Sequence, residues 1–328
     1  RRKTERGEWS GGPMYYLTDG LGAKKGCRQI GRVLAVLFAC FCILASFGIG
    51  NMSQINSISG NMNAAFGVPT LVTGLCLMVV TALIVIGGLK RVAAVTEKLV
   101  PLMALFYIAG ALMIVVLHAG NIPAAFAAIF KGAFNLNAAG GGALGYGISQ
   151  TITWGFKRGA FSNEAGLGSA VMVNSASNVK EPVHQGMWGV FEVFIDTIVI
   201  CSCTAMIMLL APKDLINGLS GMDLLQTAMQ YHLGKFGVIF IALTLFLFSF
   251  STFLGILFYA RSNVAYLFGD NWLSQTAYKI LALVMLFIGG LAAYTFVWDL
   301  GDVGIGLMTI FNMIALIPLS GQAIDSLK

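Results

Sequence analysis

Residues 161–170 read Phe-Ser-Asn-Glu-Ala-Gly-Leu-Gly-Ser-Ala, and this stretch decides the fold of the chain. It places a carboxylate, an amide, two hydroxyls and two glycines between long apolar stretches. Polar, glycine-rich backbone at membrane depth is tolerated only where it lines a cavity or is buried in protein. A helix broken in this way is the best sequence indication of a solute site in a secondary transporter. We therefore predict a helix that is interrupted at about residues 159–168.

The composition of the chain indicates a membrane protein. Of its 328 residues, 57% are hydrophobic and only 10% are charged, and the mean hydropathy is +0.82. Soluble domains carry about 25% charged residues. We predict an all-α, polytopic membrane protein, with the lipid bilayer as its surroundings.

The chain contains six cysteines and three histidines, His118, His184 and His232, at scattered positions. Their spacing matches neither a zinc site nor a disulfide framework, and the histidines form no ligand cluster. The net charge of +6 comes from basic loop residues of the kind that a membrane protein keeps in the cytoplasm. We therefore expect no cofactor, no metal beyond a coupling ion, and no nucleic acid as a partner.

A helix that crosses the hydrocarbon core of a bilayer needs about 20 apolar residues. Eight stretches of the chain meet this requirement, and the fourth contains the expected break. The expected spans cover residues 33–59, 69–89, 99–118, 143–178, 186–211, 236–261, 277–297 and 299–320. We expect the glycine- and alanine-rich segment 119–142 to be an extracellular re-entrant or surface element.

The basic residues predict which loops face the cytoplasm. Most of the 20 Lys and Arg residues lie in the loop 1–32 and in every second loop after it, whereas the intervening loops hold Lys131, Lys213 and Lys235. Because basic residues are enriched in cytoplasmic loops, we expect residues 1–32 to be cytoplasmic. The chain begins without a methionine, and we expect it to be part of a longer protein.

Five acidic residues lie inside or at the mouth of expected spans, where an ionisable group costs about 2.5–3.5 kcal/mol and is a functional hypothesis by default. Glu192 and Asp196 are four residues apart and share a helix face, so they form either a cation or proton site or a structural contact. Asp299 and Asp302 begin the last span, where we favour a role as helix caps. Glu164 lies at the expected break and is a candidate for coupling or gating.

The residues of the break itself could bind a solute directly. Half-helix N-termini attract carboxylates, and unwound backbone carbonyls can coordinate a cation. Gly159, Gly166 and Gly168 would let backbone groups face a ligand without an intervening Cβ atom. We therefore predict substrate contacts from Asn163, Gly166 and Gly168; the alternative is a glycine-bearing kink that serves packing alone.

Two further sets of polar side chains lie inside apolar spans. Ser251 and Thr252, with the carbonyl of Phe248, would supply oxygen ligands for sodium, or the hydroxyls bond back to their own helix. Asn51 and Gln54 share a helix face, and their amides suit either a zwitterionic solute or contacts between helices. The spacing leaves both pairs of alternatives open.

Four stretches of the chain carry a resemblance to a known family. They are residues 11–16 (GGPMYY), 47–57 (FGIGNMSQINS), 157–170 (KRGAFSNEAGLGSA) and 194–197 (FIDT). With them, the chain resembles the alanine or glycine:cation symporter family, whose sodium-coupled carriers belong to the amino acid–polyamine–organocation superfamily. The resemblance implies a five-plus-five inverted repeat of the leucine-transporter type, in the plasma or inner membrane of a bacterial cell.

The same resemblance implies which helices the chain supplies. The loop 1–32 would follow the second helix, so the first two helices would be absent and the chain would hold the third to the tenth helix. Residues 33–118 would be the remainder of the first repeat, and residues 143–320 would form the second repeat. The whole of residues 1–328 would be one N-terminally truncated transmembrane domain.

The resemblance also implies roles for single residues. Gln54 would contact the substrate, Phe156 would flank the pocket, and Ser251 and Thr252 would match the sodium ligands of the eighth helix. Ile256 stands where the family commonly has a tryptophan, so the pocket would be wider and a side chain larger than alanine becomes possible.

We expect a sodium-coupled symporter for small neutral amino acids, alanine and glycine, which works by alternating access. Sodium would be its coupling ion. A proton-coupled carrier, with Glu192 and Asp196 as the proton sites, and an inactive fragment of a symporter are the alternatives. A channel would need a selectivity filter and an enzyme would need a set of catalytic residues, and the chain shows neither pattern.

Overall fold

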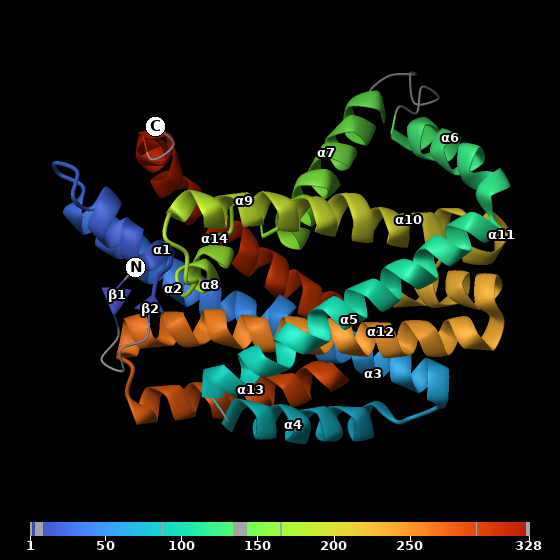
Figure 1. Ribbon diagram of the computed structural model, residues 1–328, viewed down its shortest axis with the longest axis horizontal. Helices are drawn as coiled ribbons and strands as arrows, with labels where there is room; N and C mark the ends of the chain where they lie inside the picture. The colour runs from blue at the N-terminus through green and yellow to red at the C-terminus, as the bar shows by residue number, and fades with distance from the viewer. Residues whose placement is uncertain are drawn as a thin grey trace. The chain divides into compact units, whose positions relative to one another are not determined.

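The structure is a computed structural model that describes residues 2–3, 9–86, 88–133, 143–164, 166–292 and 294–325 (Figure 1). Most of these residues are helical, and two short strands, β1 (Arg2–Lys3) and β2 (Trp9–Ser10), form an antiparallel pair. The first seven helices are α1 (Pro13–Tyr16), α2 (Arg28–Phe47), α3 (Ser53–Phe66), α4 (Thr70–Ile86), α5 (Gly88–Leu117), α6 (Ile122–Ala133) and α7 (Ala143–Ser162).

The second half of the chain continues in the same way. Its helices are α8 (Ala170–Asn174), α9 (Pro182–Val193), α10 (Ser202–Leu209), α11 (Lys213–Ile216), α12 (Gly221–Phe268), α13 (Trp272–Leu291) and α14 (Tyr294–Asp325). Within the described residues, three π-helical segments, Leu17–Leu21, Gly48–Met52 and Phe194–Cys201, and one short 3-10 helix, Ala119–Asn121, lie between these helices.

The prediction of an all-α, multi-pass membrane protein is confirmed. In the part of the chain that the structure describes, six helical runs are long and apolar enough to cross a bilayer. They are Arg28–Phe66, Ala94–Leu117, Pro182–Leu209, Gly221–Phe268, Trp272–Leu291 and Phe296–Asp325. The other two expected spans are also helical, because α4 is a shorter apolar helix and α7 covers the first part of residues 143–178.

Two glycines interrupt the long helical runs, one at the end of a run and one at a bend inside a helix. The run that contains α2 and α3 ends at Gly67, which has a left-handed φ of 67° and whose amide bonds the carbonyl of Asn63 at 2.8 Å. Glycine is favoured there because other residues pay a steric penalty in this conformation. Gly234 has φ 60° and ψ −143° inside α12 and divides that helix into two segments.

The chain forms two compact units, which we describe separately. Unit 1 contains residues 1–100, 164–190 and 246–328, and unit 2 contains residues 101–163 and 191–245. The chain passes from unit 2 to unit 1 between Asn163 and Glu164, which is within the predicted break.

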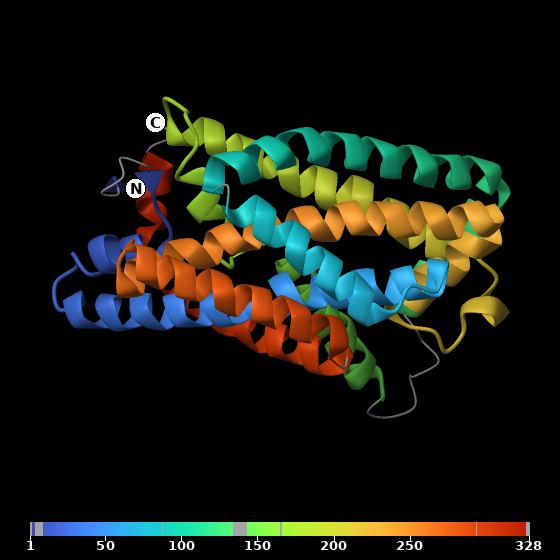
Figure 2. The same cartoon turned by 90° about the horizontal axis from the view of Figure 1, so that it is seen from below.

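Small residues let the helices of unit 1 pack closely. α2 lies beside α14, and α13 lies beside α4 (Figures 1 and 2). A Cβ atom on Gly301 would lie 1.8 Å from Cγ1 of Ile49, and one on Gly304 would lie 2.8 Å from Cβ of Ala45. Glycine at these positions of α14 therefore allows the close approach of helices that is typical of membrane proteins.

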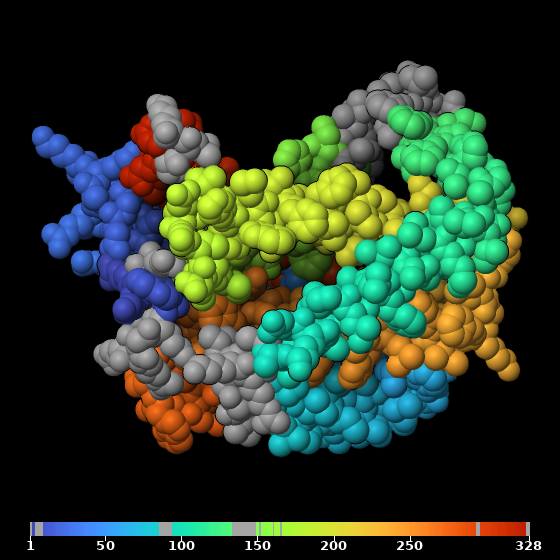
Figure 3. Space-filling model, in the orientation of Figure 1, coloured from blue at the N-terminus to red at the C-terminus, as the bar shows by residue number. Residues whose placement is uncertain are grey.

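The outer face of α4 is apolar. It exposes Leu71, Leu75, Val79 and Leu83, and the helix lies at the lower edge of the space-filling view (Figure 3). A continuous apolar face of this kind indicates contact with lipid rather than water.

Unit 2 is built on contacts of α5 with α10 and α12. Phe240 of α12 fills the space beside Gly110 of α5, where a Cβ atom would lie 2.4 Å from the phenyl ring. The hydroxyls of Tyr107 and Thr204 are 2.6 Å apart and join α5 to α10. Such hydrogen bonds between helices stabilise their contact in lipid.

The structure corrects the predicted capping role of Asp299 and Asp302, and it describes only part of the segment 119–142. Asp299 and Asp302 do not cap a helix, because α14 begins at Tyr294 and both residues lie inside it. The apolar residues before Asp299 continue the helical run, so that no helix end is left for a cap to bind. In the segment 119–142, α6 is a 12-residue helix, and residues 134–142 lie outside the described residues.

Candidate functional site

The helix that carries the predicted break ends at Ser162, and the next helix begins at Ala170. Glu164, Gly166 and Gly168 have φ values of 50°, 79° and 83°, which are left-handed and incompatible with a right-handed helix. Gly159 lies inside α7 with open space where a Cβ atom would be, so the interruption begins after Ser162 and not at Gly159. Residue 165 lies outside the described residues.

In unit 1, a single amide from α14 holds the interrupted segment. Nδ2 of Asn312 donates to the carbonyl oxygen of Gly166 at 2.7 Å, and Oδ1 of the same side chain accepts a hydrogen bond from the hydroxyl of Tyr16. Asn312 is only 1% exposed, so both of its polar atoms are satisfied inside the protein. Asn312 was not predicted from the sequence, although an isolated amide within an apolar span is a signal of the same kind as Asn51.

Gly168 is fixed by conformation and by space. Besides its left-handed φ, a Cβ atom here would lie 2.4 Å from Cγ of Pro13 and 3.0 Å from Cγ of Asn312. The backbone of the interrupted segment thus contacts α1 directly. Pro13 and Tyr16 of α1 thus both lie at the interrupted segment, Tyr16 through its bond to Asn312.

Glu164 is held within unit 1 by two hydroxyl groups. Its Oε2 atom accepts a hydrogen bond from Ser169 at 2.8 Å and one from Tyr259 of α12 at 3.1 Å. The carboxylate therefore joins the two ends of the interrupted segment to α12. This arrangement places the coupling or gating candidate in a defined polar contact rather than in apolar surroundings.

In unit 2, two consecutive residues of a π-helix hold the end of α7. Ser162 donates a hydrogen bond to Oδ2 of Asp196, and Thr197 donates one to Oδ1 of Asn163 at 2.7 Å. Asp196 and Thr197 belong to the π-helical segment Phe194–Cys201. Because π-helical turns occur frequently at functional sites, this pairing marks the end of α7 as a functional candidate.

The structure gives Glu192 and Asp196 different surroundings. Glu192 is exposed near the end of α9, whereas Asp196 is partly buried on the π-helix and bonds Ser162. The prediction of a shared face assumed α-helical spacing, and the π-helical segment that begins at Phe194 changes this spacing.

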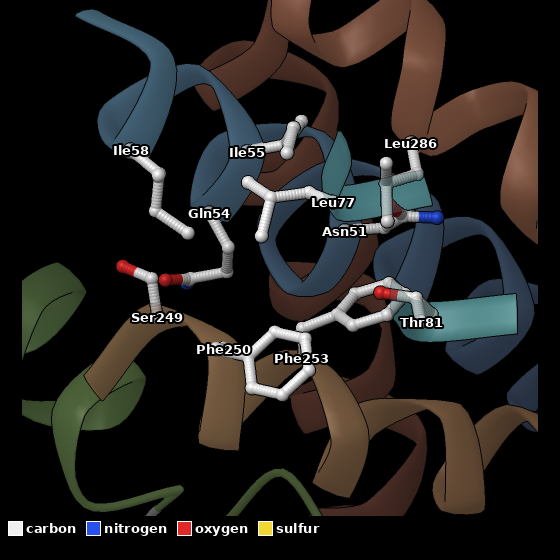
Figure 4. A pocket seen from close by; sticks show the side chains of 10 residues that line it. All are labelled: Asn51, Gln54, Ile55, Ile58, Leu77, Thr81, Ser249, Phe250, Phe253 and Leu286. Carbon is white, nitrogen blue, oxygen red and sulfur yellow. The ribbon is translucent and has the colours of Figure 1, made fainter. Parts of the chain in front are cut away.

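Asn51 and Gln54 line one small cavity of unit 1 (Figure 4). Asn51 is 1% exposed, and its Nδ2 atom donates to the carbonyl of Ala282 at 2.7 Å, while its Oδ1 atom has no hydrogen-bond partner. Gln54 donates to the carbonyl of Ile49 at 3.2 Å, and its side chain extends toward α12, where Ser249 lies. The cavity volume of about 10 Å³ is room for one water molecule rather than an amino acid.

The predicted sodium ligands lie in the second segment of α12. Oγ of Ser251 donates to the carbonyl of Phe248 at 2.9 Å, which is the bond back to the same helix that the spacing left open. Thr252 is exposed on the same helix. Ile256 packs against Gly50 of the π-helical segment Gly48–Met52, where a Cβ atom would lie 2.1 Å from Cγ2 of Ile256.

The two remaining candidates, Phe156 and Asn163, belong to unit 2. Phe156 is 77% exposed on α7, and Asn163 follows the end of this helix.

Among the described residues, no group of three or more His, Cys, Asp or Glu side chains could hold a metal ion. Oxygen atoms of carboxylates, hydroxyls, amides and the backbone are the ligands that a hard cation prefers.

Comparisons with known proteins show the family of the chain. The model of the sodium:alanine symporter family matches residues 1–328. The sodium/alanine symporter AgcS of Methanococcus maripaludis is 38% identical over 330 residues, which cover 100% of this chain and 71% of the relative. The amino-acid carrier protein AlsT of Bacillus subtilis is 39% identical over 321 residues, which cover 96% of this chain and 65% of the relative.

A transporter of Haemophilus influenzae is 38% identical over 315 residues, which cover 96% of this chain and 63% of the relative. The chain thus spans 63–71% of the length of these three relatives.

Proposed function

Because this chain belongs to the sodium:alanine symporter family, we propose that it forms the larger part of a symporter for small neutral amino acids. The protein moves alanine or glycine together with sodium across the cell membrane. Two relatives named as a sodium/alanine symporter and an amino-acid carrier support this substrate class. The family consists of transporters and not of enzymes.

The observation that carries the proposal is the interruption of the helix after Ser162. Glu164, Gly166 and Gly168 are left-handed there, so carbonyl and amide groups leave the helical ladder. Discontinuous helices of this kind form the solute sites of many secondary transporters. The hydrogen bonds of Asn312 and Asp196 on the two sides of the interruption would keep this irregular backbone in place.

We propose a five-plus-five inverted repeat as the fold. Residues 33–118 would be the remainder of the first repeat, and residues 143–320 would be the second, with the interrupted helix as its first member. The loop 1–32 would be cytoplasmic, and segment 119–142 would be an extracellular surface element. Folds of this type place the solute at the interrupted helices near the middle of the membrane.

Unit 1 holds most of the candidate substrate-binding residues, namely the side chains of Asn51, Gln54 and Ile256 and the backbone of Gly166 and Gly168. In unit 2, the candidates are Phe156 and Asn163. Oδ1 of Asn51 supports its assignment, since this buried acceptor has no partner of its own.

Sodium would bind Ser251, Thr252 and the carbonyl of Phe248. The bond of Ser251 to Phe248 is compatible with this role, because a hydroxyl that donates its hydrogen keeps both oxygen lone pairs. Sodium and the amino acid would each favour the same closed state, so each would raise the affinity for the other.

Proton coupling through Glu192 and Asp196 is the second candidate function, with Glu164 as a possible gating carboxylate. The contact of Asp196 with Ser162 at the end of α7 favours it, because a change of protonation there would act on the interrupted helix.

Flux across a membrane separates the two functions. The intact protein in proteoliposomes should accumulate labelled alanine when sodium is outside, and uptake should fall to background when choline replaces sodium. Uptake that persists in choline and follows an imposed pH gradient would instead establish proton coupling. Protein-free liposomes give the background for both conditions.

A further inference from the structure

Two of the three histidines of the chain meet in unit 2, although the sequence analysis placed them in no cluster. His118 directly follows α5, and His232 lies on α12 two residues before the bend at Gly234. The centroids of their rings are 4.5 Å apart, with an angle of 70° between the ring planes. Tyr231 lies beside them, with its ring centroid 6.3 Å from that of His118.

Backbone contacts define which nitrogen of each ring carries hydrogen. Nδ1 of His118 lies 3.0 Å from the carbonyl oxygen of Ile114, and Nε2 of His232 lies 2.8 Å from that of Ile207. A carbonyl oxygen only accepts, so both of these nitrogens are donors. In the neutral rings, Nε2 of His118 and Nδ1 of His232 therefore carry lone pairs.

The lone pair of His232 accepts no hydrogen bond within the described structure. Nδ1 of His232 is a buried atom without a hydrogen-bond partner. Histidines that bind metals typically donate their other N–H group to a backbone carbonyl or carboxylate, which fixes the tautomer and the ring orientation. Both rings of this pair show that arrangement, with the carbonyls of Ile114 and Ile207 as acceptors.

The ring separation also fits one shared metal ion. A zinc ion 2.0–2.1 Å from a ring nitrogen would lie about 3.2 Å from the ring centroid. Two centroids 4.5 Å apart would then subtend about 90° at the metal, and a shift of one ring by about 0.7 Å would reach the tetrahedral angle of about 109°.

We propose that His118 and His232 bind one first-row transition-metal ion of the zinc, copper or nickel class, which imidazole ligands favour. Water would complete the coordination, because the described residues include no group of three or more His, Cys, Asp and Glu side chains around a common point. The ion would link α5 to α12, and through Ile207 also to α10. The site shares no residue with the proposed amino acid and sodium sites and does not depend on them.

The histidines themselves supply a matched set of variants. His118→Asn and His232→Gln each replace the ring by an amide that can still donate to the backbone carbonyl, while the lone-pair nitrogen is lost. His184 is exposed on α9 in unit 1, so His184→Ala is the control for removal of one histidine from the same chain.

The test is a zinc titration of the purified intact protein by isothermal calorimetry in detergent, with gel filtration to show that each variant is folded. The wild type and His184→Ala should bind one zinc ion that His118→Asn and His232→Gln bind at least tenfold more weakly. The six free cysteines contribute the same background to every variant. Zinc binding that is equal in all four proteins, or that is weakened as much by His184→Ala, would overturn the proposal.

Discussion

The hydroxyl of Tyr16 bonds Oδ1 of Asn312, although 296 residues separate them in the chain. The same asparagine donates to the carbonyl of Gly166, so one side chain connects α1, α14 and the interrupted segment. The irregular backbone after Ser162 is therefore held by a specific amide and not only by apolar packing.

Tyr16→Phe removes the donor of this pair and leaves Oδ1 of Asn312 buried without a partner. An unsatisfied buried acceptor costs about 1–3 kcal/mol, so we expect a clear drop in the free energy of unfolding and a lower melting temperature. Tyr231→Phe is the control, because Tyr231 is 48% exposed and the loss of its hydroxyl should change stability by less than about 0.5 kcal/mol. Equal melting temperatures for the wild type and Tyr16→Phe would show that the bond contributes nothing.

The Tyr16 contact also predicts a dependence of stability on pH. Burial raises the pKa of Tyr16 above its ordinary value of 10.0, so the folded protein keeps the phenol neutral where the unfolded chain ionises it. The stabilising effect is thus complete below about pH 10 and declines as the pH rises above that value. Melting temperatures from pH 7 to 11 should fall less steeply for Tyr16→Phe than for the wild type. Parallel curves would contradict this prediction.

Alanine substitutions of three glycines in and near the interrupted segment should differ in how much they harm the protein. Gly168→Ala should be the most harmful change, because a left-handed φ costs about 1–2 kcal/mol for other residues and the new Cβ atom would lie 2.4 Å from Pro13. Gly166→Ala should have the backbone cost alone, since its nearest neighbour is 3.4 Å away. Gly159→Ala should be tolerated within α7. Thermal stability and alanine uptake of the three variants should follow this order, and a harmful Gly159→Ala would contradict the assignment.

Asp196→Asn separates a hydrogen-bonding role from a titrating one. The amide oxygen can still accept from Ser162, and the neutral bond is weaker by about 1 kcal/mol, so uptake should fall less than about tenfold. The leucine of Asp196→Leu cannot accept a hydrogen bond from Ser162, so the uptake of this variant should fall further than that of Asp196→Asn. Glu192→Gln should leave uptake unchanged, because Glu192 is exposed. If Asp196→Asn abolishes sodium-driven uptake as completely as Asp196→Leu, protonation of Asp196 is part of transport.

The sequence predicts the spans because long apolar stretches alternate with charged loops, and a bilayer requires both. It places the break one turn too early at Gly159, because a helix tolerates a single glycine at a cost of only about 0.5–1 kcal/mol. The π-helical segments were not predicted, because the spacing of apolar residues does not distinguish a short π-helical turn from the α-helix around it.

Contacts between residues that are distant in the sequence were not predicted either. The pairs Tyr16 with Asn312 and His118 with His232 depend on how the helices pack, and local spacing contains no information on this. Asn51 and Gln54 were predicted to share a face, and the structure places both at the same small cavity. Short-range geometry was therefore accessible from the sequence, whereas the partners of each side chain were not.

Hydrogen–deuterium exchange of the peptide that covers residues 161–170 tests most directly whether the interrupted helix binds the solute. The intact protein is compared in choline, in sodium, in choline with alanine, and in sodium with alanine. If sodium and alanine together stabilise this irregular backbone, its amides should exchange most slowly when both are present. Identical exchange of this peptide under all four conditions would contradict the assignment of the site.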